Sequence, residues 1–433
     1  MTLLKAVRGT RDLLPPETEL WNRVEATARR VFARYNFGEI RTPIFEDTQL
    51  FARGVGEETD IVSKEMYTWE DRARAQSEKA QSLTLRPENT AGVVRAYIEH
   101  KLGETGLLQK LYYIGPQFRR ERPQKGRYRQ FWQIGAEVIG PPSAGSESPL
   151  RDAEVLEMLA SFLDELGITG WNLVLNSVGS ASDRPRYVAA LREALREVAP
   201  RMCVDCQRRA ETNPLRVLDC KVPEDQPIIE TLPKIADYLD DASKAHFKAV
   251  LAALEACGVP YTLNPRLVRG LDYYTRTTFE FTHGELGAQN ALLGGGRYDG
   301  LSEMIGGPKA PGIGFAMGLD RLILTLQHAA SQKGQAEQSA LADAYIAPIG
   351  EDQDATALAL ARELRREGLR VELGDGSFRL KKSFEAGNKV ARAIVLLGED
   401  EHRSGILTVK RFASGEQVKV ARGELAAALR GSD

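Results

Sequence analysis

The stretch that decides the fold runs from residue 111 to residue 138: Leu-Tyr-Tyr-Ile-Gly-Pro-Gln-Phe-Arg-Arg-Glu-Arg-Pro-Gln-Lys-Gly-Arg-Tyr-Arg-Gln-Phe-Trp-Gln-Ile-Gly-Ala-Glu-Val. Residues 119–129 hold five Arg, one Lys and one Glu, in a chain whose formal net charge is −2. Apolar segments flank this basic run and a Pro and a Gly interrupt it, which predicts a strand, a loop and a return strand. We expect such a hairpin to bind phosphate, because the planar guanidinium group meets two phosphate oxygens at once.

Bulk composition excludes several classes of protein. The 433 residues are 42% hydrophobic and 27% charged, as in ordinary soluble proteins, and this length suggests about three domains. A net charge near zero excludes a general nucleic-acid coat, so any polyanion site must be a local patch. No apolar run approaches the ~18 residues of a membrane helix, and the N-terminus lacks the features of a signal peptide. We therefore predict a cytoplasmic protein.

The cysteines leave two interpretations open. Cys203 and Cys206 have the spacing of half a zinc site, and Cys220 is a candidate third ligand. A second cysteine pair or paired histidines are missing, and His246 is the only histidine nearby. Four cysteines in a long chain do not form a disulfide framework. The sequence therefore favours free thiols in a reducing cytosol and no metal, with zinc as the alternative.

The first two thirds of the chain mix helices and strands. Apolar spacing predicts helices over 17–35, 90–101 and 152–166, with Asn89 as the N-cap of the second. Residues 70–82 have no apolar anchor and are predicted to form a loop. Residues 183–258 are rich in helix pattern and charge and carry all four cysteines. They interrupt two regions of strands and glycines, so we interpret them as an inserted helical module.

The last part of the chain is predicted to be a separate α/β domain. A polar linker over 331–341 precedes it. Strand and helix patterns then alternate through 342–433. The strands are expected over 344–347, 370–373, 393–397 and 405–410, and the helices over 353–367, 378–387 and 422–430.

Four further segments carry polar or glycine-rich motifs. They are Thr84-Leu-Arg-Pro-Glu-Asn-Thr90, Leu267-Val-Arg-Gly-Leu-Asp-Tyr-Tyr-Thr-Arg-Thr277, Gly294-Gly-Gly-Arg-Tyr-Asp-Gly300 and Gly312-Ile-Gly-Phe-Ala-Met-Gly-Leu-Asp-Arg321. The third is interpreted as a glycine turn, and the fourth as glycines before a helix. None is a dinucleotide-binding fingerprint, and the P-loop pattern is missing. One such segment is usually structural; five in order, with the hairpin, indicate one site.

Together these segments resemble the histidyl-tRNA synthetase family of class II aminoacyl-tRNA synthetases. Pro43, the hairpin from Phe118 to Glu137, and Gly314 to Arg321 are similar to the three class II motifs, the first of which lies at the dimer interface. The segments 267–277 and 294–300 are similar to the two histidine-specific signatures. The resemblance covers nearly the whole chain.

The resemblance implies a fold and a reaction. The expected fold is α+β: a catalytic domain over 1–330, built on an antiparallel sheet and interrupted by the insertion 183–258, then an anticodon-binding domain over 342–433. The implied activity is that of a histidine–tRNA ligase acting on ATP, L-histidine and tRNA(His), with Mg²⁺, as a homodimer. The alternative is a non-catalytic regulatory subunit of ATP phosphoribosyltransferase, a paralogue that lacks the anticodon domain.

The residues that the resemblance implies for ATP binding are mainly arginines. The substrate carboxylate is ionised at pH 7, with a pKa near ~3.5, so the reaction needs cations around the phosphorus rather than a general base. Arg119 would bind the α-phosphate, Arg321 would lie toward the γ-phosphate, and Arg269 would bridge the carboxylate and the α-phosphate. The remaining implied ATP contacts are Glu121, on the adenine amino group or Mg²⁺, Arg127, on the phosphate tail, and Phe131, stacked on adenine.

For histidine and tRNA, the resemblance assigns polar groups. Glu88 and Gln133 would bind the ammonium group, while Glu137 and Tyr274 would bind the two imidazole nitrogens. Gln133 and Glu137 are four residues apart on a strand and therefore share a face. The further histidine contacts implied are Thr90, Arg269, Tyr273 and Tyr298. The tip of the hairpin would meet the acceptor end of tRNA through Arg120, Arg122, Gln124 and Lys125.

Overall fold

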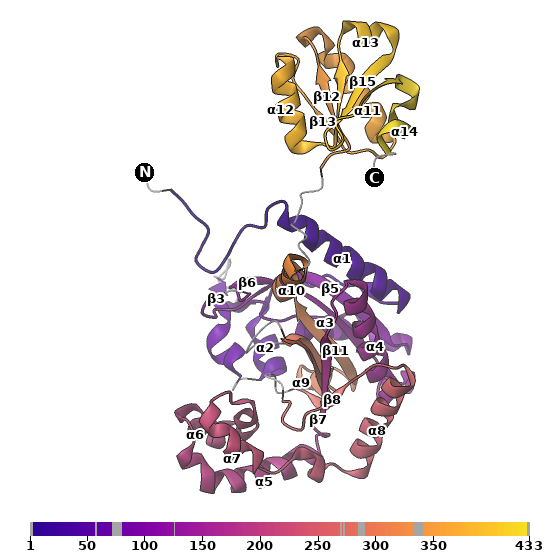
Figure 1. Cartoon of the computed structure of the whole chain (residues 1–433). Coiled ribbons are helices and arrows are strands. Elements are labelled where there is room, and N and C mark those ends of the chain that lie inside the picture. The colour runs from indigo at the N-terminus through magenta and orange to yellow at the C-terminus, as the bar shows by residue number, and fades with distance from the viewer. Residues whose placement is uncertain are drawn as a thin grey trace. The chain divides into compact units, whose positions relative to one another are not determined.

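The computed structural model describes residues 3–56, 59–71, 80–124, 126–268, 271, 273–284, 291–332 and 341–430. The chain forms two compact units, Met1–Ala336 and Glu337–Asp433. Each unit has its own sheet and its own core (Figure 1). No helix within the described ranges combines the length and the apolar character needed to cross a membrane.

An eight-stranded sheet, in the order β1-β5-β6-β11-β10-β9-β7-β8, is the frame of the first unit. Its strands are β1 (Gly38–Glu39), β5 (Gln109–Phe118), β6 (Gln130–Ile139), β7 (Trp171–Ser177), β8 (Thr262–Leu263), β9 (Thr275–His283), β10 (Ala291–Arg297) and β11 (Gly312–Gly318). The edge pairs β1–β5 and β7–β8 are parallel. The five pairs between them are antiparallel. The predicted antiparallel sheet is confirmed.

The predicted hairpin is formed by β5 and β6. Their register is unbroken from Gln109 opposite Ile139 to Phe118 opposite Gln130, so the basic run 119–129 forms the loop that joins them. The loop is narrow at its base, where the Arg119 N–H donates to the Arg129 carbonyl at 3.0 Å. The Arg129 N–H in turn donates to the Gly9 carbonyl at 2.7 Å, which ties the loop to the N-terminal arm.

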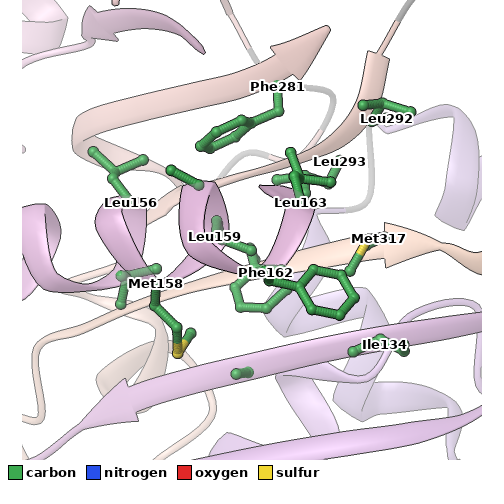
Figure 2. Close-up of a cluster of buried hydrophobic side chains, with 14 of the residues drawn as sticks. Ile134, Leu156, Met158, Leu159, Phe162, Leu163, Phe281, Leu292, Leu293 and Met317 are labelled. Carbon is green, nitrogen blue, oxygen red and sulfur yellow. The ribbon is translucent and has the colours of Figure 1, made fainter. Parts of the chain in front are cut away.

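Four long helices pack on the main sheet: α1 (Glu17–Arg34), α4 (Pro149–Glu165), α8 (Asp241–Ala256) and α10 (Leu319–Gln332). On α1 the predicted apolar face is buried, from Trp21 to Phe32. Figure 2 shows Leu159, Phe162 and Leu163 of α4 against apolar side chains of β6, β9, β10 and β11. Burial of large apolar side chains drives this assembly, since each contributes about 1.5–3 kcal/mol.

A three-stranded sheet lies beside α2 (Thr48–Val55) in the order β2-β4-β3, with bounds β2 (Phe45–Asp47), β3 (Tyr67–Asp71) and β4 (Gln81–Leu85). The predicted loop 70–82 is wrong at both ends, because Glu70 pairs with Ser82 and Asp71 with Gln81. These four residues form strands because their backbones pair, although their side chains are polar and show no apolar alternation. Residues 72–79 lie outside the described residues.

The glycine turn predicted over 294–300 is wrong in its first half, because Gly294, Gly295 and Gly296 lie within β10. A side chain on Gly295 would meet the backbone of the neighbouring strand at Gly314 and Phe315. The glycines therefore allow close strand approach rather than a turn. Arg297 at the end of β10 is fully buried and pairs with Asp152 at 2.6 Å and Asp299 at 2.8 Å.

The region 183–258 is helical, as predicted, and contains α5 (Asp183–Val198), α6 (Val204–Thr212) and α7 (Gln226–Glu230) (Figure 1). Tyr187, Leu191 and Leu195 of α5 pack with Cys206 and Leu218 in a second core cluster, which extends to Ile139 of β6 and to Tyr298. The last helix of the region behaves differently. Helix α8 packs on α4 and joins the core of the main sheet.

The second unit is a five-stranded sheet in the order β13-β12-β14-β15-β16. Its strands are β12 (Ala344–Pro348), β13 (Val371–Leu373), β14 (Ala393–Leu397), β15 (Ile406–Arg411) and β16 (Gln417–Ala421), and its helices are α11 (Asp354–Arg366), α12 (Leu380–Val390), α13 (Glu399–Ser404) and α14 (Leu425–Arg430). The predicted α/β pattern is present, although the sequence analysis missed β16 and α13. Of the predicted linker, residues 331–332 belong to α10 and 333–340 lie outside the described residues.

Candidate active site

A cavity of about 520 Å³ lies over β6, β10 and β11 in the first unit. Its wall joins segments that are far apart in sequence. The predicted binding residues that line it are Glu88, Thr90, Arg119, Glu121, Arg127, Phe131, Gln133, Glu137, Tyr273, Tyr274, Tyr298 and Arg321. Arg120, Arg122 and Gln124 lie on the exposed side of the hairpin loop instead. Arg269 and Lys125, which the sequence analysis also assigned, lie outside the described residues.

One end of the cavity is rich in guanidinium groups. Arg119 Nε donates to the Pro87 carbonyl at 2.9 Å, and its guanidinium carbon lies 5.2 Å from the centre of the Phe131 ring. These contacts fix the side chain between the hairpin and the segment before α3 (Thr90–Glu99). Glu121 pairs with Arg127 at 3.0 Å and lies 3.8 Å from Arg119. An aromatic face beside cations suits a nucleotide base with its phosphates.

A third arginine approaches the cavity from helix α10. Arg321, near the start of α10, donates to the Ala291 carbonyl at 3.1 Å. Burial lowers the pKa of Arg321, and the positive charge of Arg127 lowers it further. The preceding Asp320 is held by Arg11 at 2.9 Å. Guanidinium groups that repel one another in one cavity are the arrangement that an anion stabilises.

The carboxylate of Glu88 lies at the N-terminus of α3. It accepts from the Thr90 N–H at 2.8 Å and from the Ala91 N–H at 3.0 Å. Asn89 is the N-cap residue, as predicted, but its side chain makes no capping hydrogen bond, and the Glu88 carboxylate accepts from the first N–H groups of the helix in its place. The Asn89 side chain oxygen accepts from Thr42 and Arg86 instead. Burial raises the pKa of Glu88, and the two N–H donors oppose this rise.

Glu137 is the most deeply enclosed carboxyl of the cavity, with a side chain that is 0% exposed. Thr90 donates to one of its oxygens at 2.8 Å and Tyr298 donates to the other at 2.7 Å. Burial raises the pKa of Glu137 to about 8, although these hydroxyls oppose the rise. Each carboxylate oxygen can accept a second hydrogen bond, so the carboxylate retains the capacity to bind a ligand.

Gly314 makes room for this carboxylate. It lies opposite Glu137 in the β6–β11 ladder, and a methyl group at this position would overlap the Glu137 side chain. The positions of Gly314 and Glu137 are therefore coupled. A sequence with any larger residue at 314 could not hold the carboxylate where it lies.

Gln133 and a group of tyrosines complete this end. Gln133 is 8% exposed, and its Oε1 has no hydrogen-bond partner among the described residues. A buried oxygen without a partner is costly, which indicates a position for a ligand donor. The Tyr273 ring lies 4.8 Å from that of Tyr274 and 6.0 Å from that of Tyr298. The cavity thus has a cationic end and an end of carboxyl, amide and phenol groups.

Four charged residues of the wall were missed by the sequence analysis: Asp219, Lys221, Glu280 and Asp320, the last of which is paired with Arg11. Glu280 lies on β9 between Phe279 and Phe281, which are buried in the core. Strand alternation could have placed Glu280 on the opposite face. Asp219 and Lys221 come from the helical module and flank Cys220. No local pattern indicates their position, because only the packing of the module brings them to the cavity.

The comparisons with known proteins agree with this geometry. Residues 9–322 match a family model described as "Histidyl-tRNA synthetase", and residues 343–432 match one described as "Anticodon binding domain". The chain is 73% identical to the histidine–tRNA ligase of Koribacter versatilis, covering 99% of this chain and 96% of that one. For the ligase of Solibacter usitatus the identity is 57%, with 99% of each chain covered. The crystal structure of apo S. aureus histidyl-tRNA synthetase has a TM-score of 0.78 and 36% identity, covering 99% of this chain and 100% of that one.

Proposed function

The chain belongs to the histidyl-tRNA synthetase family, and from this we propose that it activates L-histidine with ATP and transfers the histidine to the 3′-terminal adenosine of tRNA(His). It is an aminoacyl-tRNA ligase with the class II fold, as the sequence analysis predicted. The observation that carries the proposal is the cavity, which joins an arginine-rich end to a buried carboxyl end. The alternative, a regulatory subunit, is less supported, because residues 343–432 match an anticodon-binding domain.

The first step joins the histidine carboxylate to the α-phosphorus of ATP and releases pyrophosphate. Both reactants are negatively charged, so the cost of bringing them together dominates the barrier. Arg119, held by Pro87 and Phe131, is proposed to bind the α-phosphate. Fixed guanidinium groups stabilise the charge of the transition state without having to reorganise.

The remaining ATP contacts follow from the same end of the cavity. Phe131 is proposed to stack on the adenine, while Arg127 and Arg321 bind the phosphate tail. Glu121 would bind either the adenine amino group or Mg²⁺, which takes oxygen ligands and retains several waters. In the second case Glu121 and Glu280, which both line the cavity, would hold the ion, and the ion would neutralise phosphate charge. The role of Arg269, between the substrate carboxylate and the α-phosphate, rests on the sequence.

At the other end, Glu137 is proposed to accept from one imidazole nitrogen while Tyr274 bonds the other. Glu88 and Gln133 would bind the ammonium group. Thr90 and Tyr298 then orient the Glu137 carboxylate, as their hydrogen bonds indicate, and Tyr273 supports the ring of Tyr274. A polar pocket of this kind rejects substrates that lack the hydrogen bonds by ~10⁴–10⁵.

The experiment that tests the function is ATP–pyrophosphate exchange by the purified protein. We expect exchange that depends on histidine and is not supported by the other nineteen amino acids. The histidine-dependent charging of tRNA(His) should follow in the same preparation. Exchange driven equally by another amino acid, or no exchange with any, would contradict the proposal.

The exposed side of the hairpin loop is proposed to bind the acceptor end of tRNA. It carries Arg120, Arg122 and Gln124, and Lys125 is assigned to it from the sequence.

The second unit is proposed to bind the anticodon, as its family match indicates. The domains we propose remain 1–330, interrupted by 183–258, the linker 331–341, and 342–433; the two compact units support the separation of the last domain from the first. We also propose a cytoplasmic location.

The double variant Arg120→Ala/Arg122→Ala separates the two steps. Both side chains are exposed and neither lines the cavity, so we expect unchanged pyrophosphate exchange. The kcat/KM for tRNA should fall about tenfold, and the slope of log affinity against log salt should shrink by about 2, because two phosphate contacts are lost. The measurement is aminoacylation at several salt concentrations. An equal loss in both assays would assign these residues to ATP instead.

A homodimer is proposed from an exposed apolar surface near the first class II motif. Phe45 and Trp69 are 54% and 40% exposed, and their rings are 6.2 Å apart. Leu3, Leu4 and Val7 of the N-terminal arm are exposed as well, at 79%, 96% and 68%. Large apolar side chains that lie exposed side by side, as Phe45 and Trp69 do, mark interaction sites, and the motif indicates a second copy of the chain.

Replacing Phe45 and Trp69 by Glu tests this surface. We expect the dimerisation constant to weaken about tenfold or more, because two apolar anchors are lost. Sedimentation equilibrium over a range of protein concentrations measures it. Leu150→Glu is the control, since Leu150 is 56% exposed and lies at the start of α4. A monomeric parent protein, or a control that dissociates equally, would contradict the assignment.

A further inference from the structure

Three cysteines and an aspartate of the helical module converge on one point. Cys203 precedes α6, Cys206 lies in its first turn, Cys220 follows the 3₁₀ helix Pro214–Asp219, and Asp225 precedes α7. The three sulfurs and one carboxylate oxygen all lie within 4.8 Å of one another. The Cys203 and Cys220 sulfurs are 3.9 Å apart, and the Cys220 sulfur is 3.2 Å from the Asp225 oxygen.

The distance between the Cys203 and Cys220 sulfurs matches an edge of a metal tetrahedron. A Zn–S bond of about 2.3 Å places two sulfur ligands about 3.8 Å apart in tetrahedral geometry. A disulfide requires sulfurs at about 2.05 Å, and the four cysteines are free thiols. His246, the nearby histidine considered from the sequence, is bonded to Asp152 at 2.8 Å and takes no part. The fourth ligand is a carboxylate, so the sequence patterns of zinc sites, which consist of cysteine and histidine pairs, do not include it.

The surroundings orient these groups as a ligand set. Cys206, Cys220 and Asp225 are buried, with 0%, 4% and 2% of their surfaces exposed, and Cys203 is half-buried. The Cys203 N–H donates to both oxygens of Asp225, at 3.0 and 3.2 Å, which fixes the carboxylate. The Val222 N–H donates to the Cys220 sulfur at 3.4 Å. Hydrogen bonds of this kind hold metal ligands in place and stabilise thiolate charge.

We propose that Cys203, Cys206, Cys220 and Asp225 bind one structural Zn²⁺ ion. Binding forms three Zn–S bonds and one Zn–O bond, and the thiol protons are released to solvent. Four protein ligands leave no open position for substrate, which distinguishes a structural from a catalytic site. The ion would join α6, the 3₁₀ helix and α7, which are short elements with little helical stability of their own.

The site also borders the cavity. Cys220 stands between Asp219 and Lys221, both of which line the cavity wall. An ion that fixes Cys220 would therefore fix this part of the wall. The zinc proposal rests on the ligand geometry alone, so it does not depend on the proposed aminoacylation.

Zinc content of the full chain tests the proposal. The protein is purified under reducing conditions without a chelator or a metal-affinity column, supplied with Zn²⁺, desalted and measured by plasma mass spectrometry. We expect about one zinc per chain, and about a tenth or less in Cys206→Ser and Cys220→Ser. Cys257→Ser is the matched control, because Cys257 is exposed and lies outside the cluster. Asp225→Asn should bind zinc more weakly than the parent protein.

A second measurement decides the matter if the serine variants do not fold. In the parent protein a thiol reagent should modify Cys257 rapidly and the other three slowly, and a mercurial should release one zinc while exposing all four. No zinc after supply together with four reactive thiols would overturn the proposal. A Cys203–Cys220 disulfide, found by alkylation and peptide mapping, would overturn it equally. Unchanged zinc affinity in Asp225→Asn would remove that residue from the site.

Discussion

Replacing Arg119 with Ala is expected to slow histidyl-adenylate formation by about 10²–10³-fold, because one fixed cation at the transferring phosphorus is lost. Arg119 is restrained by the Pro87 carbonyl and by the Phe131 ring, and it lines the cavity between them. Such a pre-positioned group acts mainly in the transition state, so the loss should appear in kcat more than in the KM for ATP. The measurement is pyrophosphate exchange at varied ATP and histidine.

Two variants sharpen this result. Arg119→Lys retains the charge but loses the planar fork, and it should recover only part of the rate. Arg129→Ala is the matched control: Arg129 belongs to the same loop, but its side chain donates to the Arg8 carbonyl at 3.2 Å and does not line the cavity. Near-normal exchange in Arg119→Ala, or an equal loss in Arg129→Ala, would refute the role.

Glu137→Gln is expected to raise the KM for histidine about 100-fold and to leave the KM for ATP unchanged. An acceptor for the imidazole becomes a neutral amide, and hydrogen bonds to charged groups contribute about 1.5–3 kcal/mol each. Tyr298→Phe should have a smaller effect in the same direction, since it removes one hydroxyl from the carboxylate and leaves the charge. An unchanged KM for histidine in Glu137→Gln would remove Glu137 from the pocket.

The same variant should change the pH dependence of stability without substrate. The pKa of Glu137 is raised from 4.5 to about 8, so between these values the folded protein keeps a proton that the unfolded chain has lost. The free energy of unfolding of the parent protein therefore falls as pH rises through this window, by up to ~1.4 kcal/mol per pH unit from this group. Glu137→Gln removes that slope.

Chemical denaturation at pH 5, 6, 7 and 8 measures the effect as a difference between the two proteins. Glu137→Gln should gain stability relative to the parent as pH rises, and it should show no gain below about pH 4.5. Glu88 also has its pKa raised by burial, so the comparison between variants, rather than either curve alone, isolates Glu137. A constant difference across this range would show that the carboxyl is ionised throughout.

The sequence predicted those parts of the molecule that depend on local pattern. The hairpin could be predicted because two apolar runs joined by a basic loop with Pro and Gly are compatible with few other structures. In the same way, α1 follows from the helical spacing of its apolar residues. Strand β16 could also have been predicted, because Val418 and Val420 alternate with polar residues. In the structure these two valines are less exposed than their neighbours.

The contacts that shape the site could not be predicted from local pattern. Thr90 and Tyr298 donate hydrogen bonds to Glu137 from positions 47 and 161 residues away along the chain. No pattern in the sequence around any of the three residues indicates these hydrogen bonds. Gly294 to Gly296 suggested a turn, yet their function is to allow strands to approach closely. Asp225 gives no sign in the sequence of its place beside three cysteines, since carboxylates are common and only packing selects this one.

The glycine beneath the buried carboxyl limits how this pocket can change. A methyl group at position 314 would meet the Glu137 carboxylate and also the backbone carbonyl of Ala136, at 2.7 Å. Shortening Glu137 would therefore remove only one of the two obstacles, because the Ala136 carbonyl belongs to the sheet itself. A protein engineer who wishes to admit a different amino acid must leave Gly314 in place and change the side chains around the carboxyl instead.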